Sequence, residues 1–154
     1  MSLVEQIQKD IVTAMKAKEE ARLSTLRMVK TALKNREVEK MAPLDDKEAQ
    51  QILSTLIKQR KESVEAFTKG NRPEMAAHEQ AEIVLIESYL PKAASEAEIV
   101  EGVRAAMAEM RSAGASLTMK DMGTVMKAAM AKFAAADVRV DGKVVSETVK
   151  KELA

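Results

Sequence analysis

Apolar residues recur at three- and four-residue intervals along most of the chain, which is the spacing of amphipathic α-helices. The first helix is predicted to begin after Ser2, which can form a capping box with Glu5 three residues later. A second helix is predicted to end near Pro43, because the residue before a proline disfavours the α conformation. The apolar positions of these two helices are Val4, Ile7, Ile11 and Met15, followed by Leu23, Leu26, Val29 and Leu33.

Two further helices are predicted before residue 92. Asp45 or Asp46 can cap the third helix, and Gly70 is expected to end it in a left-handed turn. Pro73 suits the first turn of the fourth helix, and Pro91 stops that helix. The connections are short enough for antiparallel neighbours. The apolar positions are Ile52, Leu53, Leu56, Ile57, Val64 and Phe67 in the third helix, and Met75, Ile83, Ile86 and Leu90 in the fourth.

Three shorter helices are predicted in the last third of the chain. Gly114 is expected to end the first of them. The candidate N-cap residues are Ser95, in a capping box with Glu98, then Ser116 or Thr118, and finally Asp141. The apolar positions are Ile99, Val103, Met107 and Met110, then Met119, Met122, Met126, Met130 and Phe133, and last Val145, Val149 and Leu153.

Together these patterns predict an all-α protein with two domains. An N-terminal four-helix domain is expected at residues 1–91, and a small three-helix bundle at residues 92–154. The composition agrees, because the chain has only 5 Gly and 3 Pro and therefore few places to turn. With 46% apolar and 32% charged residues, it resembles a soluble globular protein and not a disordered one.

Composition also excludes several classes of protein. The chain has no cysteine, which rules out disulfides, thiol catalysis and cysteine-ligated zinc. The N-terminus lacks the apolar run of a secretory signal, and no segment reaches the roughly 20 apolar residues of a membrane span. A cytoplasmic location and no membrane partner are therefore expected. The net charge of +1 means that attraction to nucleic acid requires a local basic patch.

The sequence contains no recognisable catalytic motif. Nucleophile elbows, Walker loops and dinucleotide fingerprints are all missing, so we expect no catalytic residue and no cofactor. The one histidine, His78, lies four residues from both Glu74 and Glu82, which is a geometrically conceivable metal site. A solvated surface histidine is the better interpretation, and we expect no metal.

Two features of the last third suggest contact with another element. The stripe of Met119, Met122, Met126 and Met130 could be a flexible docking surface, but the core of a small bundle is the favoured interpretation. Gly123 lies inside a predicted helix, where glycine costs about 1 kcal/mol relative to alanine. Close backbone approach would offset that cost, with a neighbouring helix slightly favoured over a bound partner.

The second predicted helix carries a basic ridge. Arg27, Lys30 and Lys34 follow i, i+3, i+7 spacing, with Arg22 nearby, and such a ridge suits phosphate binding. Acidic residues follow at once, and a charged helix face is more often simply solvated. Aromatic residues for base stacking are scarce, so any nucleic-acid contact would be to the backbone.

Several short sequences resemble the bacterial YqeY proteins. Each is short, but their order and spacing together are fairly specific, and the resemblance covers essentially the whole chain. They are Arg22-Leu23-Ser24-Thr25-Leu26-Arg27 followed by Lys30, Glu87-Ser88-Tyr89-Leu90-Pro91, Gly114-Ala115-Ser116, Asp121-Met122-Gly123, Val125-Met126 and Asp141-Gly142.

The resemblance implies a helical protein similar to the C-terminal tail of the B subunit of the tRNA-dependent amidotransferases. Those complexes amidate Glu-tRNA(Gln) or Asp-tRNA(Asn) with glutamine and ATP, and the tail is implicated in holding the tRNA. Their chemistry lies in a separate cradle domain that this chain lacks. The label of carbon–nitrogen ligase with glutamine as amide donor would therefore belong to the complex. The implied partners are tRNA and amidotransferase or aminoacyl-tRNA synthetase proteins.

By analogy with that tail, two surfaces are candidate RNA contacts. The chain departs from a typical tail at residues 134–140, where glycine is common in the family and absent here. The alternative hypothesis is a protein-interaction adaptor without RNA binding, which the methionine stripe and Gly123 would serve. The candidate RNA-binding residues are Arg22, Arg27, Lys30 and Lys34 on the second helix, and Gly114, Ser116, Asp121 and Gly123 in the last third.

Overall fold

The computed structural model describes all 154 residues and is entirely helical. It contains seven α-helices and one 3-10 turn, η1, and its one β-type contact is an isolated bridge between Ala93 and Arg139. The all-α fold predicted from the sequence is confirmed. The chain divides into two compact units, Met1–Leu90 and Pro91–Ala154, which we call unit 1 and unit 2. None of the helices combines the length and apolar character needed to cross a bilayer.

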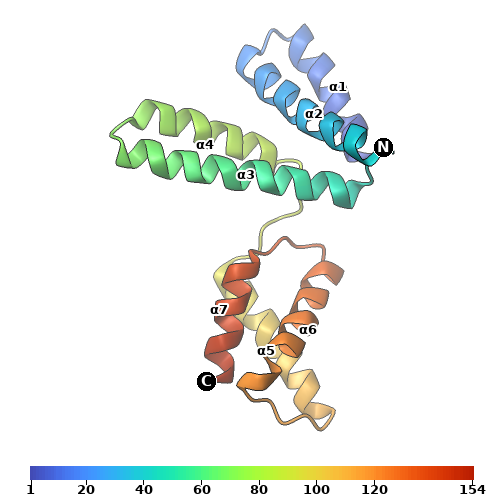
Figure 1. The fold of residues 1–154 in the computed structure, drawn as a ribbon, viewed down its shortest axis with the longest axis vertical. Helices are drawn as coiled ribbons and strands as arrows, with labels where there is room; N and C mark the ends of the chain where they lie inside the picture. Colours follow the sequence, from blue (N-terminus) through green and yellow to red (C-terminus); the bar gives the residue numbers. More distant parts are fainter. The chain divides into compact units, whose positions relative to one another are not determined.

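Unit 1 consists of two helical hairpins (Figure 1). The helices α1 and α2 lie side by side, as do α3 and α4. The core takes side chains from all four helices, with Ile7, Leu26, Leu53 and Ile83 almost fully buried in it. The bounds are α1 Leu3–Lys16, α2 Glu20–Lys40, α3 Asp46–Lys69 and α4 Pro73–Glu87.

Helix starts in unit 1 follow the local capping chemistry. Ser2 and Glu5 form the predicted capping box at α1, and Asp45 forms a second one with Glu48 at α3. Asp46 serves a different purpose, because its Oδ1 accepts a hydrogen bond of 2.8 Å from the backbone N–H of Leu3. The start of α1 is thereby tied to the start of α3.

In three turns of unit 1, a residue other than glycine adopts the left-handed backbone conformation. Lys18, Met41 and Asn71 have φ values of 55°, 57° and 55°. The prediction that Gly70 would supply the left-handed turn after α3 is wrong, because Gly70 has φ −81° and Asn71 takes that conformation instead. Asparagine tolerates it better than most residues, which explains the exchange.

A buried ion pair joins the two helices of the second hairpin. Arg60 on α3 donates from Nε to Glu82 Oε2 on α4 at 2.8 Å, and from Nη1 to the carbonyl of Leu56. Its Nη2 also contacts the sulfur of Met28 on α2. Arg60 is only 8% exposed, and these partners offset the desolvation of its guanidinium.

Unit 2 is a bundle of three helices with its own core (Figure 1). Thr118 caps the 3-10 turn η1, which leads directly into α6, and Asp141 caps α7. Ser95 accepts from the N–H of Glu98 at the start of α5. Gly114 follows α5 with φ +96°, as predicted. The bounds are α5 Glu96–Ser112, η1 Met119–Asp121, α6 Met122–Ala135 and α7 Gly142–Leu153.

The methionine stripe does not form the core of unit 2. On α6 the buried positions are Val125, Ala129 and Phe133, and none of them belongs to the stripe. Met119 is 45% exposed and Met130 is 37% exposed, whereas Met122 and Met126 pack only at the edge of the core. Val125, Ala129 and Phe133 fill the centre from α6, so the favoured core interpretation of the stripe is wrong at both of its ends.

The glycine that permits close packing is Gly102, not Gly123. A Cβ placed on Gly102 of α5 would lie 2.5 Å from Cε1 of Phe133, whereas a Cβ on Gly123 would meet nothing within 4 Å. The expectation that a neighbouring helix approaches Gly123 is therefore wrong. The turn after α6, which has no glycine, is made by Asp137 with φ 53°.

Candidate functional site

The predicted basic ridge lies on the outer side of α2 in unit 1. Arg27, Lys30 and Lys34 are exposed and Arg22 is half-buried, while Leu26, Val29 and Leu33 of the same helix point into the core. The helical repeat therefore separates the cations from the apolar face.

Carboxylates neutralise the two ends of this ridge but not its middle. Arg22 Nη1 lies 3.4 Å from Glu19 Oε2, and Lys34 Nζ lies 3.3 Å from Glu37 Oε2. Arg27 and Lys30 have no ion-pair partner, and the nearest polar contact of Arg27 is Met15 Sδ at 3.9 Å. We call Arg27 and Lys30 the unpaired cations of α2.

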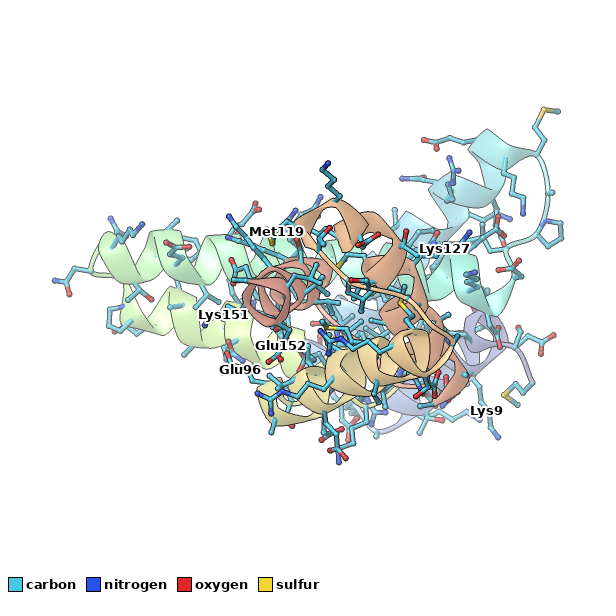
Figure 2. The ribbon with its side chains drawn as sticks, turned by 90° about the horizontal axis from the view of Figure 1, so that it is seen from below. Lys9, Glu96, Met119, Lys127, Lys151 and Glu152 are labelled. Atoms are coloured by element: carbon cyan, nitrogen blue, oxygen red, sulfur yellow. The ribbon has the colours of Figure 1, made fainter.

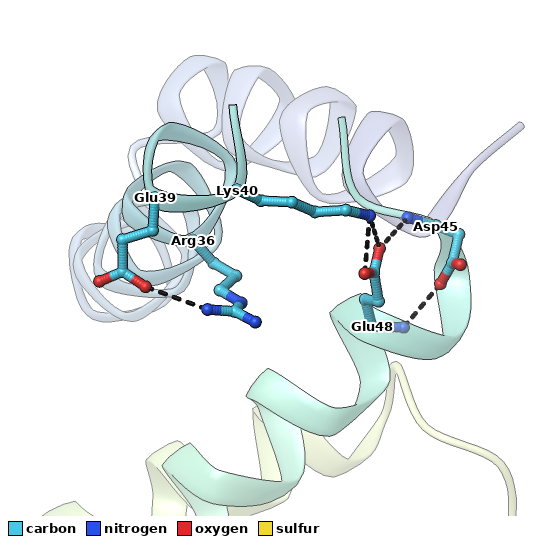
Figure 3. Close-up of polar contacts among 5 residues, drawn as sticks. All are labelled: Arg36, Glu39, Lys40, Asp45 and Glu48. Carbon is cyan, nitrogen blue, oxygen red and sulfur yellow. Dashed lines mark hydrogen bonds and ion pairs between the residues drawn. The ribbon is translucent and has the colours of Figure 1, made fainter. Parts of the chain in front are cut away.

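Beyond Lys34, the cations of α2 are engaged in ion pairs within unit 1 (Figure 3). Arg36 contacts Glu39 at 3.2 Å, and Lys40 Nζ lies 2.7 Å from both carboxylate oxygens of Glu48 on α3. Hydrogen bonding to Lys40, reinforced by the cap at Asp45, lowers the pKa of Glu48. This end of α2 is therefore neutralised, and the ridge that can attract an anion is shorter than the sequence suggested.

A groove of about 610 Å³ runs between α1 and α2 beside the unpaired cations. Ile7 and Leu33 line it at the apolar centre, and Lys30 and Lys34 line it from α2. Lys9 adds a third ammonium group from α1. The sequence analysis missed Lys9, because only the pairing of the two helices brings it to the ridge.

Arg22 also has a structural task. Its guanidinium hydrogen-bonds Tyr89, which raises the pKa of Arg22. The hydroxyl of Tyr89 donates to Asp10 Oδ2 at 2.6 Å. Burial, together with the bond to Asp10, raises the pKa of Tyr89 to about 12. These three residues join α1, α2 and the segment after α4, a cluster that sequence spacing gives no means of predicting.

The second set of candidates surrounds the connection between α5 and α6 in unit 2. Asp121 Oδ2 accepts from the backbone N–H of Thr118 at 2.7 Å, so its carboxylate closes the cap of η1. Gly114 provides the turn after α5. Ser116 and Gly123 are exposed, and a Cβ placed on Gly123 would meet no atom within 4 Å. Of this set, Ser116 and Gly123 are thus the positions without an evident structural task.

His78 contacts one of the two glutamates predicted to accompany it. Its Nε2 lies 3.2 Å from Glu82 Oε1, while the other oxygen of Glu82 accepts from Arg60. No group of three or more His, Asp or Glu side chains is placed to hold a metal ion. The carboxylate of Glu82 therefore serves the α3–α4 hairpin.

The sequence profile of the family described as Yqey-like protein matches residues 4–153. A relative from Lachancea thermotolerans, named Altered inheritance of mitochondria protein 41, mitochondrial, is 37% identical over 121 residues, covering 77% of this chain and 65% of the relative. Proteins of the same name from Vanderwaltozyma polyspora and Eremothecium gossypii are 33% and 32% identical, covering 75% and 73% of this chain and 64% and 63% of theirs.

These relatives correct two expectations from the sequence. They are yeast proteins and not bacterial ones, and their names place them in mitochondria, which contradicts the expected cytoplasmic location. The matched region spans less than two thirds of the length of each relative. The family match, in contrast, covers almost every residue and agrees with the resemblance carried by the short sequences. The chain belongs to the YqeY-like family.

Proposed function

We propose that this protein is a non-catalytic helical module that binds the phosphate backbone of tRNA through the ridge on α2. The observation that supports it most is the pair of unpaired cations, Arg27 and Lys30, which are exposed and one helical turn apart. An exposed cation without a carboxylate partner keeps its full attraction for a phosphate, because no internal ion pair must first be broken.

The neighbouring groups support the same proposal. Lys9 adds an exposed ammonium group on the α1 side of the groove between α1 and α2. Glu5 and Glu37 also line this groove, and Glu37 pairs with Lys34, so the positive charge is concentrated at Lys9, Arg27 and Lys30. No aromatic side chain lines this groove, so its contacts would be to phosphates and not to stacked bases. Binding of this kind is independent of base sequence and depends strongly on salt.

The family resemblance supplies tRNA as the RNA class and an amidotransferase as the associated enzyme. The label of carbon–nitrogen ligase with glutamine as amide donor fits the complex better than this chain, whose sequence holds no motif for glutaminase or ligase chemistry. We expect the purified chain to show no turnover with glutamine, ATP and charged tRNA.

The test is tRNA binding by gel shift or fluorescence anisotropy across a series of salt concentrations. The double variant Arg27→Glu, Lys30→Glu should bind at least about tenfold more weakly at low salt, and the slope of log affinity against log salt should fall by about 2. The matched control is Lys58→Glu, Lys61→Glu on α3, which makes the same charge change at the same spacing on exposed positions.

Two results would refute direct tRNA binding. One is a wild-type protein without affinity for tRNA at low salt. The other is an equal loss of affinity in the α3 control, which would indicate a response to net charge only. Circular dichroism of both variants checks that the helices persist.

A protein-interaction adaptor is the second candidate, and the outer face of α6 favours it. Met119, Met130 and Gly123 are exposed there, and Figure 2 shows Met119 and Lys127 among the surface side chains of η1 and α6. Methionine adapts its shape to a partner, and an uncrowded glycine lets a partner backbone come close. Recovery of one protein partner after nuclease treatment, with no RNA affinity, would select this function.

A further inference from the structure

A groove of about 630 Å³ in unit 2 has no role in the proposed binding of tRNA. It lies between the first half of α5 and the end of α6, and it continues along the segment that follows α6. Gly102 and Ala105 line it from α5, and Phe133 and Ala136 line it from the other side.

The groove exists because its walls carry very small side chains. The ring of Phe133 occupies the space where a side chain on Gly102 would lie, as the distance of 2.5 Å from a Cβ to its Cε1 shows. Ala105 and Ala136 are exposed beside it. Phe133 is only 6% exposed and covers Gly102, so an apolar side chain from outside would lie mainly on Ala105 and Ala136 and meet the small accessible part of the ring.

The rim of the groove is acidic. Glu98 and Glu101 line it from α5, and Glu98 contacts Ser95 in the helix cap, which leaves Glu101 as the exposed carboxylate without a partner. The lining cation, Lys132, is held by Glu109 at 2.6 Å. In addition, α6 ends at Ala135 beside the groove, and the C-terminal end of a helix carries partial negative charge.

These charges decide which class of ligand fits. Phosphates would be repelled by the two carboxylates and by the end of α6, so the groove does not suit RNA. A ligand with an apolar side chain next to a cationic one fits both parts of the groove. The apolar side chain contacts the small residues that line it, and the cation is attracted to the carboxylates at its rim.

We propose that this groove binds a short segment of a partner protein in which a medium-sized apolar residue lies within one helical turn of a lysine or arginine. The apolar residue lies on Ala105 and Ala136 beside the accessible part of Phe133, and the cation pairs with Glu101. The groove belongs to unit 2 and the α2 ridge to unit 1, so this proposal does not depend on the proposed binding of tRNA.

The test selects peptides that bind the full-length protein from a displayed library of 12-residue peptides. Peptides that also bind the Ala105→Leu variant are removed, because the larger side chain of this variant blocks the groove. The enriched peptides should share an apolar residue close to lysine or arginine. A selected peptide should shift the NMR amide signals of Gly102, Ala105 and Ala136, and Glu101→Lys should weaken its binding about tenfold.

Matched controls separate the groove from the rest of unit 2. Ala108→Leu adds the same bulk at an exposed position of α5 outside the groove, and Glu147→Lys makes the same charge change on α7. Both should bind the peptide as the wild type does. The proposal is overturned if selection yields no enriched peptide, if the enriched peptides lack basic residues, or if their NMR shifts map elsewhere. It is also overturned if a short RNA displaces the peptide from the groove.

Discussion

At the scale of single residues, the two helical glycines of unit 2 have opposite consequences. Both lie within helices, and the sequence alone pointed to Gly123 as the one with a packing role. The structure gives that role to Gly102, because Phe133 is buried against it. Helix periodicity cannot reveal such a contact, since it depends on how α6 packs on α5.

Substitution of each glycine by alanine should change stability in opposite directions. Gly102→Ala should lower the free energy of unfolding by about 1–3 kcal/mol, because the new methyl group overlaps the ring of Phe133. Gly123→Ala should raise it by less than the roughly 0.5–1 kcal/mol typical of a helix interior, because Gly123 lies in the first turn of α6, where alanine meets no neighbour. Urea unfolding followed by circular dichroism measures both, and a stabilising Gly102→Ala would contradict the packing described here.

The tyrosine buried against Asp10 should titrate abnormally. Tyr89 is the one tyrosine of the chain, so ultraviolet absorbance follows it without interference, and its pKa should be about 12 and not the ordinary value near 10. A pKa raised in the folded state means that the contribution to stability is complete below pH 10 and is lost as the pH rises toward 12.

A variant identifies the source of that shift. Asp10→Asn removes the charge that helps to hold the phenol protonated, so the pKa of Tyr89 should fall but stay above 10 because burial remains. An unshifted wild-type titration near pH 10 would show that Tyr89 is neither buried nor bonded to Asp10 in solution.

At the scale of helices, capping was the part of the structure most readable from sequence. Ser2 and Asp141 cap helices as predicted, because a cap involves only residues up to three positions apart. Where the sequence left two candidates open, the structure selects Asp45 over Asp46 and Thr118 over Ser116. The left-handed turn at Asn71 was assigned to the adjacent Gly70, since glycine is the usual choice there.

Contacts between helices could not be predicted from the sequence, because they depend on how the helices pack. The candidate sites could be predicted only in part for the same reason. The ridge on α2 was predicted as a row of cations, but which of them stay unpaired depends on side-chain rotamers and on α3, as at Lys40 and Glu48. The groove in unit 2 went unnoticed because its defining contact, between Gly102 and Phe133, joins two helices.

At the scale of the whole molecule, the chain holds two hydrophobic cores. One is built from residues of unit 1 and the other from residues of unit 2. A unit with its own core has the main requirement for folding alone, although small domains are marginal. We propose that the two units are independently folding domains, with the boundary at Leu90 and Pro91.

Separate expression tests this proposal. Fragments 1–90 and 91–154 should each melt cooperatively by circular dichroism, and the sum of their spectra should match that of the whole chain. The shorter fragment is expected to unfold at the lower temperature, because it buries less apolar surface. A broad, non-cooperative melt of either fragment would mean that it needs the other to fold.

The left-handed residues at the turns have a practical consequence for engineering. Lys18 and Met41 hold φ values of 55° and 57° with full side chains, a conformation that costs non-glycine residues about 1–2 kcal/mol. Both are exposed and lie in turns, and neither lines one of the two grooves or belongs to the α2 ridge. Glycine at these two positions therefore offers a route to a more heat-resistant version of the protein in which every surface proposed to bind a ligand is left intact.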